Sequence, residues 1–392
     1  MLKRSVFFLL YTVLTINSAF SQNARKLHFK ASVVDTHNDI LTTIATEGVN
    51  IDNDLTGKTH SDINRFRKGG VDVQIFSIWC DGNRKNPFQW ANREIDSLYA
   101  IAFRNTDKMA IAYSPADLKQ ILKKKKFAAL IGVEGGHMIE NDLSKLDSLY
   151  KRGARYMTLT WNNSTSWATS AMEETGKGDS LKNKGLSDFG RQVVKRMNEL
   201  GMMVDVSHVG EHTFWDVINT TVKPVIASHS DAYTLCPVFR NLKDDQIKAI
   251  GKNGGVICLN FYSGFLDSTF NVKRSAFNQR HKEERDSLLK TVTDPYFADT
   301  YLASKYKDEV EAYRAPFRLL LDHLDYIVKL IGVDHVGIGS DFDGISSPPQ
   351  QLDGVQDFPK ITEALLQRGY SKKDIRKILG ENVLRVFAEN QK

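Results

Sequence analysis

The sequence is poor in cysteine: its 392 residues contain only Cys80, Cys236 and Cys258, and no Cys-X-X-Cys pair. Three thiols cannot form the disulfide framework of a small secreted scaffold, and a chain of this length buries enough apolar surface to fold without one. The missing Cys-X-X-Cys pair argues against a zinc site built from thiolates. At most one disulfide can form, and at least one thiol must remain.

The chain also lacks internal repeats, low-complexity runs and Pro- or Gly-rich linkers; its nine prolines and 26 glycines are scattered. We therefore expect residues 22–392 to form a single domain. The formal net charge is +6, and removal of Lys3 and Arg4 with residues 1–21 lowers it by two. Because the remaining charge is small and no basic face carries interleaved aromatic residues, we expect no nucleic-acid partner.

An apolar run near the N-terminus indicates the compartment. Lys3 and Arg4 precede the run Ser5–Leu14, and the small residues Ala19 and Ser21 follow it. This pattern is typical of a cleaved secretory signal, here residues 1–21. The alternative is an uncleaved anchor, but the run is shorter than the roughly 20 residues that a membrane span needs. We expect a mature protein without a membrane span that is periplasmic or secreted.

Eight short apolar runs predict buried β-strands. Amphipathic stretches such as 186–200, with apolar residues at steps of three and four, lie between them and predict helices. Strands that alternate with helices indicate a parallel sheet, so we predict an α/β fold, a (β/α)8 TIM-like barrel. The predicted strands are Ser32–Thr36, Val71–Ile75, Ala128–Val133, Tyr156–Thr160, Met203–Ser207, Val225–Ser228, Val256–Phe261 and Val336–Ser340.

The long, highly charged segment from Asp267 to Ala315 interrupts this alternation between the seventh and eighth predicted strands. It includes HKEERDSLLK and YKDEVEAYRAPF. We expect a helical insertion, residues 267–315, with one or two helices above the barrel mouth. One interpretation is a lid over the active site, and the other is a surface insertion without a role in function.

Four of the eight apolar runs are followed by side chains of the types that bind metals. His37 and Asp39 follow the first, Glu134 the third, His208 the fifth and His229 the sixth. The carboxyl ends of barrel strands are where (β/α)8 enzymes hold their active sites. A single His or Glu at a strand end can equally be a hydrogen-bonded structural residue. Together, the five predict a metal centre, and imidazole and carboxylate ligands suit zinc.

The spacing divides these side chains into two metal sites. His37 and Asp39 are two residues apart, so their side chains point the same way from a strand. Glu134 has two carboxylate oxygens and can span two cations about 3.5–4 Å apart, while His208 and His229 complete the second site. Two such cations lower the pKa of a shared water and polarise a carbonyl, as amide hydrolysis requires.

A general base is also needed, and the eighth run, HVGIGSDFDG, supplies two candidates. Asp341 or Asp343 could accept the proton of the water and pass it to the leaving amine. Asp341 lies nearer the predicted strand end, so we favour it. The alternative for each is a helix N-cap or a loop carboxylate.

Several long motifs follow one another along the chain: VVDTHNDI, GVEGG, GARYMTLT with SWA following, GMMVDVSH, PVIASHSDAYTLCPVFRNL, GGVICLNFY and HVGIGSDFDG. With these motifs the chain resembles the renal or membrane dipeptidases, zinc-dependent members of the amidohydrolase-like barrels. The resemblance extends from about residue 33 to 387. It implies an exported hydrolase that cleaves small dipeptides, tolerance of a C-terminal D-residue, two zinc ions per chain and a homodimer.

The resemblance also implies roles for single residues. Its zinc ligands match the same five side chains, with Glu134 as the bridging carboxylate, and its catalytic aspartate matches Asp341. An arginine eleven residues after the last zinc histidine holds the substrate carboxylate in this family, and that position is Arg240 here. A guanidinium fork suits a carboxylate because it can bind both oxygens.

Two positions depart from the family pattern. The substrate-binding histidine that follows TLT in relatives of the renal enzyme is Trp161 here, and an indole N–H donates a hydrogen bond without a positive charge. Trp161 is either a substrate-binding residue or a core aromatic residue. Cys236 matches a family disulfide position, but its partner is missing around residues 261–265, so we predict no disulfide of the renal type.

The departure at Trp161 keeps two other functions open. One is a binuclear metal amidohydrolase or lactonase that acts on a non-peptide substrate. The other is a metal-stabilised binding protein of the cell envelope without turnover. The complete ligand set and Asp341 favour an enzyme over the second.

Overall fold

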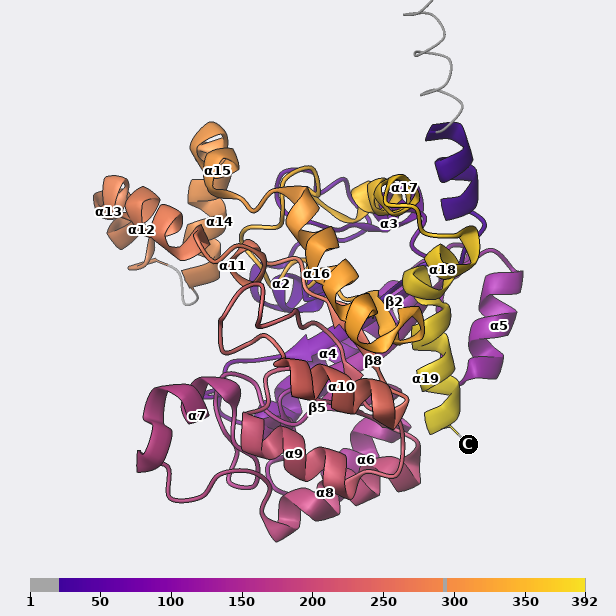
Figure 1. The fold of residues 1–392 in the computed structure, drawn as a ribbon, viewed down its shortest axis with the longest axis vertical. Coiled ribbons are helices and arrows are strands. Elements are labelled where there is room, and N and C mark those ends of the chain that lie inside the picture. Colours follow the sequence, from indigo (N-terminus) through magenta and orange to yellow (C-terminus); the bar gives the residue numbers. More distant parts are fainter. Residues whose placement is uncertain (1–20, 292–294, 392) are drawn as a thin grey trace, which may run out of the picture.

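The computed structural model describes residues 21–291 and 295–391 (Figure 1). The predicted signal peptide, residues 1–21, lies outside the described residues except for Ser21. Within the described ranges, none of the helices combines the length and the hydropathy that crossing a bilayer requires. All three cysteines are buried and free.

Eight parallel strands form a nearly closed barrel in the order β1-β2-β4-β5-β6-β7-β8-β9. The first and last strands meet where Thr36 N–H donates to the carbonyl of Ile338 at 3.1 Å and Asp39 N–H donates to that of Phe342 at 2.9 Å. This topology confirms the predicted (β/α)8 barrel. The strands are β1 (Val34–Asp35), β2 (Val73–Trp79), β4 (Phe127–Glu134), β5 (Ala154–Thr158), β6 (Met203–Asp205), β7 (Ile226–Ala227), β8 (Val256–Leu259) and β9 (Val336–Ile338).

Every predicted strand overlaps one of these eight strands. A further short strand, β3 (Met109–Ile111), pairs only with β4 and lies off the barrel path. The strand β1 is shorter than predicted because the chain beyond Asp35 leaves regular pairing with β2. It continues instead through an isolated bridge between Asn38 and Phe342, next to the last strand.

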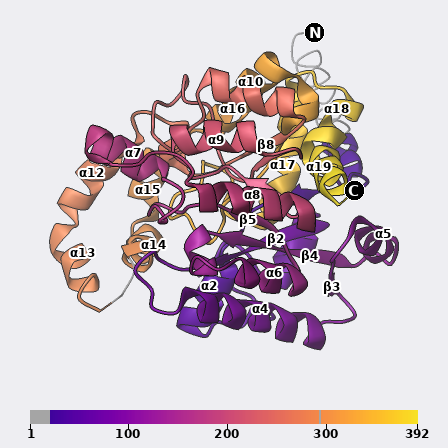
Figure 2. The same cartoon turned by 90° about the horizontal axis from the view of Figure 1, so that it is seen from below.

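Helices surround the barrel (Figures 1 and 2). The predicted helix around 186–200 illustrates why they form: the Ser187 side chain caps the first turn, and Gly201 ends the helix in the left-handed conformation. Residues 21–28 are helical at the start of the described chain. Further α-helices outside the 267–315 segment are α2 (Ile40–Glu47), α3 (Ile63–Gly69), α4 (Pro87–Arg104), α5 (Pro115–Lys123), α6 (Leu143–Lys151), α7 (Ala171–Lys177), α8 (Asp188–Leu200), α9 (Glu211–Thr220), α10 (Asp244–Asn253), α11 (Ser263–Leu266), α16 (Phe317–Ile331), α17 (Phe358–Gln367), α18 (Lys372–Arg376) and α19 (Asn382–Asn390).

The C-terminal helix α19 packs on the interior of the barrel. Val383, Val386 and Phe387 of this helix share one buried cluster with side chains near the amino ends of the strands, including Val34 and Val73. That end of the barrel is therefore filled by apolar side chains. The opposite end, at the carboxyl ends of the strands, is left for polar groups.

The segment 267–315 lies between β8 and β9 and projects to one side of the helices around the barrel in both views (Figures 1 and 2). Its described part has four short helices rather than one or two: α12 (Phe270–Arg280), α13 (Lys282–Leu288), α14 (Pro295–Lys305) and α15 (Lys307–Tyr313). Helices this short show too few turns for the apolar pattern to separate them. The segment has a small core of its own, made by Phe270, Phe277, Leu302, Val310 and Tyr313.

Candidate metal centre and active site

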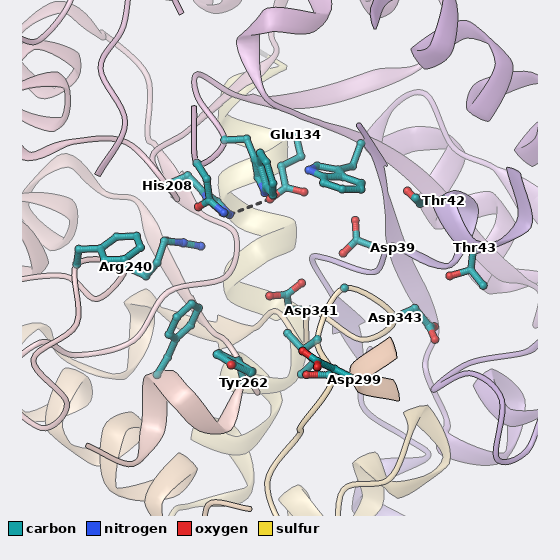
Figure 3. Close-up of a pocket in the computed structure, with 18 of the residues that line it drawn as sticks. Asp39, Thr42, Thr43, Glu134, His208, Arg240, Tyr262, Asp299, Asp341 and Asp343 are labelled. Carbon is teal, nitrogen blue, oxygen red and sulfur yellow. Dashed lines mark hydrogen bonds and ion pairs between the residues drawn. The ribbon is translucent and has the colours of Figure 1, made fainter. Parts of the chain in front are cut away.

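The five side chains predicted to bind metal meet at the carboxyl end of the barrel. His37 and Asp39 follow β1, Glu134 is the last residue of β4, His208 follows β6 and His229 follows β7. All five are buried. Figure 3 shows Asp39, Glu134 and His208 around one cavity. The structure therefore brings together residues that lie up to 192 positions apart in the chain, as the sequence pattern predicted.

Glu134 lies between two sets of side chains and turns one oxygen toward each. Its Oε2 is 3.4 Å from Nε2 of His37, and that nitrogen is 3.4 Å from Oδ2 of Asp39. Its Oε1 is 2.8 Å from Nε2 of His208 and 3.5 Å from Nε2 of His229. This is the arrangement that a carboxylate needs in order to bridge two cations.

Hydrogen bonds at the far side of each imidazole orient Nε2 toward the cavity. Nδ1 of His37 is 2.8 Å from the hydroxyl of Tyr156, which donates its own proton to the carbonyl of Thr36. Nδ1 of His208 is 3.2 Å from Oδ1 of Asn162. In each case an oxygen accepts the Nδ1 proton, so Nε2 keeps its lone pair.

His229 has the same arrangement through Ser228. Nδ1 of His229 is 2.8 Å from Oγ of Ser228, and the Ser228 hydroxyl donates to the buried carboxylate of Asp205 at 2.6 Å. The Nε2 atoms of His229 and His208 lie 3.0 Å apart. The lone pairs of these two Nε2 atoms repel each other at this distance, and a cation bound by both nitrogens removes the repulsion.

The donor atoms fit metal ions on independent grounds. Nε2 of His37 and Oδ1 of Asp39 are buried and have no hydrogen-bond partner among the described residues. Leaving buried polar atoms without a partner is costly unless a ligand satisfies them. Imidazole nitrogens and carboxylate oxygens are the donors that zinc and related divalent cations take. The residues present therefore fit the group that they are predicted to bind.

The electrostatics of the site favour neutral histidines next to an ionised carboxylate. Burial, reinforced by the charge of Arg240, lowers the pKa of His208 to about 4. Burial and the neighbouring His37 hold the pKa of His229 well below its usual range. Burial would raise the pKa of Glu134, but the three histidines hold it well below the ordinary value. Neutral imidazoles and a charged carboxylate are the forms that bind metal.

His37 responds in the opposite direction. Burial acts to lower its pKa, but Tyr156, Asp39 and Glu134 together raise that pKa well above the ordinary value. The surroundings of this nitrogen therefore favour a positive charge, which either a proton or a metal cation can supply.

Asp341 lies at the rim of this centre. Oxygens of Asp341 and Asp39 and a nitrogen of His37 all lie within 4.8 Å of one another. Asn260 Nδ2 donates to Oδ2 of Asp341 at 2.8 Å, which fixes the carboxyl group. Burial, opposed by His37 and reinforced by Asp39 and Glu134, raises the pKa of Asp341 well above the usual range of a carboxyl group.

The second candidate base, Asp343, is held by other groups. Its Oδ1 accepts from the backbone N–H of His60 at 2.6 Å, and its Oδ2 accepts from the hydroxyl of Ser61. Asp341 and Asp343 both have positive φ, 58° and 67°. Such backbone conformations are strained in residues other than glycine and concentrate at functional sites. Asp341 is thus the freer carboxylate, and Asp343 anchors the loop.

Arg240 and Trp161, the predicted substrate-binding residues, both line the cavity, whose volume is about 340 Å³. Figure 3 shows Arg240 in the cavity wall. Arg240 is 5% exposed; its Nη2 donates to the carbonyl of His229 at 3.3 Å, and its Nε has no partner among the described residues. Trp161 is half-buried and packs edge-on against Trp79, with ring centroids 5.0 Å apart. Trp161 therefore forms part of the cavity wall rather than the core.

The cavity wall also includes residues that sequence reasoning missed. Tyr262, Arg274 and Asp299 line it, the last two from the 267–315 segment. Figure 3 shows Tyr262 and Asp299. Tyr262 follows β8 at the carboxyl end of the barrel, so the strand-end rule could have found it. No pattern in the charged sequence distinguishes Arg274 from its neighbours, which lie on the surface.

Comparison with solved structures supports this fold and gives the site a context. The probable dipeptidase PvdM from Pseudomonas aeruginosa is 26% identical, with a TM-score of 0.76 over 95% of this chain and 99% of that chain. A dipeptidase described as a metallopeptidase of family M19 is 24% identical, with a TM-score of 0.73 over 92% and 98% of the two chains. A metallopeptidase from Rhodobacter sphaeroides, solved with a phosphinate mimic of the dipeptide L-Ala-D-Ala, is 22% identical, with a TM-score of 0.74 over 92% and 99%.

The family comparison covers nearly the whole chain. The sequence model of the membrane dipeptidases, peptidase family M19, matches residues 21–392, which include the barrel and all candidate site residues. The resemblance drawn from the motifs is thereby confirmed. The chain belongs to the membrane dipeptidase family, peptidase family M19.

Proposed function

We propose that the protein is an exported, two-zinc dipeptidase that hydrolyses the peptide bond of small dipeptides, including those with a C-terminal D-residue. Membership of the membrane dipeptidase family makes the protein a metal-dependent hydrolase. The observation that supports a two-metal centre is the position of Glu134, whose two oxygens face separate sets of nitrogen and oxygen donors.

His37 and Asp39 would hold one cation, His208 and His229 would hold the other, and Glu134 would contact both. The mixture of imidazole and carboxylate donors favours zinc. When bound, two such cations lower the pKa of a shared water and polarise the scissile carbonyl. The chain itself must supply substrate binding, orientation and proton transfer.

Arg240 binds the C-terminal carboxylate of the dipeptide. Its guanidinium is held beside the centre by the carbonyl of His229, and the unpartnered Nε leaves donors for a ligand. In a buried position a charge-assisted pair of this kind is stronger than a neutral hydrogen bond. Arg240 thereby sets the distance between the scissile bond and the metal centre.

Asp341 moves the proton. Asn260 holds one of its oxygens, and the carboxylate has an oxygen within 4.8 Å of ligand atoms of His37 and Asp39. A carboxylate at this place can accept a proton from the attacking water and donate it to the leaving amine. The hydrogen bonds that occupy Asp343 support Asp341 for this role.

Trp161 takes the place of the family histidine beside the substrate. Its ring packs against Trp79 and lines the cavity. An indole cannot carry the positive charge of an imidazolium, so less stabilisation of a developing oxyanion comes from this position. We therefore expect lower turnover of ordinary dipeptides than a histidine would permit.

The presence of Trp161 in place of the family histidine also favours one alternative function. A binuclear metal amidohydrolase or lactonase acting on a non-peptide substrate would use the same centre and Asp341, but would not need the histidine. A broader aromatic wall at Trp161 and Trp79 would suit such a substrate.

Two further parts of the proposal concern the whole molecule. The signal-like N-terminus supports export to the periplasm or secretion, and the family resemblance supports a homodimer. N-terminal sequencing of the exported protein should find Gln22 first. Light scattering of the purified protein should give twice the mass of one chain.

Release of free amino acids from L,L- and L,D-dipeptides tests the proposal directly. We expect hydrolysis by the zinc-loaded protein, loss of hydrolysis after chelation and recovery when zinc is restored. If the protein binds both metals but cleaves no dipeptide in the panel, the dipeptidase proposal is wrong and the non-peptide hydrolase takes its place.

A further inference from the structure

The segment 267–315 contributes charged side chains to the wall of the substrate cavity. Arg274 of α12 and Asp299 of α14 line the same cavity as Glu134 and Asp341. Figure 3 shows Tyr262 and Asp299 on the other side of Asp341 from Glu134. Since the five proposed metal ligands and Asp341 all come from the barrel, this wall is a separate structural unit that faces the substrate.

Arg274 is fixed within that wall. Its Nη1 donates to the hydroxyl of Tyr262 at 2.6 Å, and its Nη2 forms an ion pair with the carboxylate of Asp299. The ring of Tyr262 packs against both the barrel core and the small core of the segment. Two of the five N–H groups of the guanidinium make these contacts, and among the described residues the others make no hydrogen bond, so they can bind a ligand.

The charges around Arg274 do not cancel. Asp299 accepts from Nε of Arg285 at 2.9 Å as well as from Arg274, so two guanidinium groups share one carboxylate. Asp299 is only 10% exposed, and the cluster carries a net positive charge. Asp341 and Asp343 also line the cavity, but Asp341 accepts from Asn260, and Asp343 already accepts from the His60 backbone and from Ser61.

Arg274 and Arg240 lie along one wall, separated by two aromatic rings. Cζ of Arg240 is 5.4 Å from the ring centroid of Phe265, and that centroid is 4.9 Å from the ring centroid of Tyr262, whose hydroxyl binds Arg274. A ligand whose terminal carboxylate binds Arg240 therefore extends along apolar rings toward a second guanidinium. A second carboxylate is the group that this position recognises.

We propose that Arg274 is a specificity-determining residue that binds the side-chain carboxylate of the substrate, so that dipeptides containing an acidic residue are preferred. This inference rests on the proposed dipeptidase function and deepens it. It also assigns the 267–315 segment a role in selecting substrates, which a surface insertion would lack.

The test compares matched substrates and matched variants. The substrate pairs are Ala-Glu with Ala-Gln and Glu-Ala with Gln-Ala, each with L- and D-residues at the C-terminal position. Arg274→Met removes the guanidinium. Lys273→Met removes a cation from the neighbouring position, which pairs with Asp267 and does not line the cavity. Arg274→Lys keeps the charge without the planar fork.

We expect the wild-type protein to have a higher kcat/KM for the acidic member of at least one pair. In Arg274→Met that preference should fall by about ten-fold or more, the size of one charge-assisted hydrogen bond, mainly through KM. Lys273→Met should keep the preference, and Arg274→Lys should lie between. An equal preference in Arg274→Met and Lys273→Met would overturn the proposal.

A binding measurement keeps the inference independent of turnover. Trp79 and Trp161 line the cavity, so their fluorescence reports a ligand there. N-acetylglutamate should bind the wild-type protein more tightly than N-acetylglutamine, and Arg274→Met should lose this difference. Absence of the difference in the wild type refutes the acidic subsite, whereas failure to cleave any dipeptide refutes only the dipeptidase proposal. Unchanged far-ultraviolet circular dichroism of Arg274→Met shows that the segment remains folded.

Discussion

The hydroxyl oxygen of Ser228 lies 2.8 Å from Nδ1 of His229, and this contact determines which nitrogen of the imidazole faces the metal centre. Ser228 can only accept here, because its proton goes to the carboxylate of Asp205 at 2.6 Å. Asp205 also accepts from the backbone N–H groups of Ser207 and Ser228. A buried carboxylate thus orients a proposed metal ligand through one hydroxyl group.

Replacing Ser228 with alanine should weaken metal binding. The Nδ1 proton of His229 would lose its acceptor, so the ring could rotate or take the other tautomer. Loss of such an outer partner costs about 10–100-fold in metal affinity. Competition with a chromophoric chelator measures the affinity. Ser230→Ala is the control, because the hydrogen bond that its hydroxyl makes within the described residues is to Ser207. Metal affinity equal in both variants would show that Ser228 does not orient the ligand.

Asp341→Asn should keep both metals and lose turnover. The amide can still contact Asn260 but cannot accept a proton, so kcat should fall by about 10²-fold or more. Metal analysis and steady-state kinetics of the same preparation measure the two effects. Asp343→Asn should instead lower thermal stability, since Asp343 holds His60 and Ser61. Full activity of Asp341→Asn would show that another group is the general base.

Gly344→Ala should disturb the centre without adding a polar group. A Cβ atom at this position would collide with the carboxylates of Asp39 and Asp341. Overpacking of this kind costs about 1–3 kcal/mol, and a displacement of about 1 Å at a reacting group can cost about 10²-fold in rate. Gly176→Ala is the control, because nothing lies within 4 Å of its added Cβ. Equal activity of the two variants would contradict the crowding of these carboxylates.

Two buried histidines that are not among the proposed metal ligands should make stability depend on pH. Nδ1 of His28 contacts the hydroxyl of Thr362, and Nδ1 of His323 accepts from the backbone N–H of Ala232. Their Nε2 atoms donate to the carbonyls of Gly69 and Leu266. Burial lowers the pKa of each histidine from 6.5 to about 4.

The unfolded chain therefore binds protons more readily than the folded protein between pH 6.5 and about 4. The stabilisation is complete above pH 6.5 and falls as the pH decreases toward 4, by up to about 3 kcal/mol for each histidine. Urea unfolding of the chelator-treated protein from pH 7 to 4.5 measures this slope. The double variant His28→Gln/His323→Gln should show a shallower slope, and an unchanged slope would assign the effect to other groups.

The fold and the meeting of the five candidate ligands could be predicted because both depend on local patterns. Apolar runs identify buried strands, and parallel strands in a barrel bring their carboxyl ends together. His37, Glu134 and His229 therefore converge whatever the exact strand lengths. The ends of β1 and β7 could not be predicted, since each keeps only two residues in regular pairing.

Contacts that depend on tertiary packing could not be predicted. Tyr156 and Ser228 look like ordinary strand residues in the sequence, yet they set the orientation of His37 and His229. Trp161 could have been a core residue, and only its packing against Trp79 places it in the cavity wall. Arg274 lies in a charged helix, and its direction depends on how the small core of the 267–315 segment packs against Tyr262.

Metal content of Glu134→Ala tests the central claim most directly. Because Glu134 contributes an oxygen to both halves of the centre, we predict two zinc ions per chain in the wild-type protein and loss of both in the variant, at equal far-ultraviolet circular dichroism. Atomic emission spectroscopy after dialysis against trace zinc gives the stoichiometry. Two zinc ions retained by Glu134→Ala would contradict a bridging carboxylate and the two-metal hydrolase built on it.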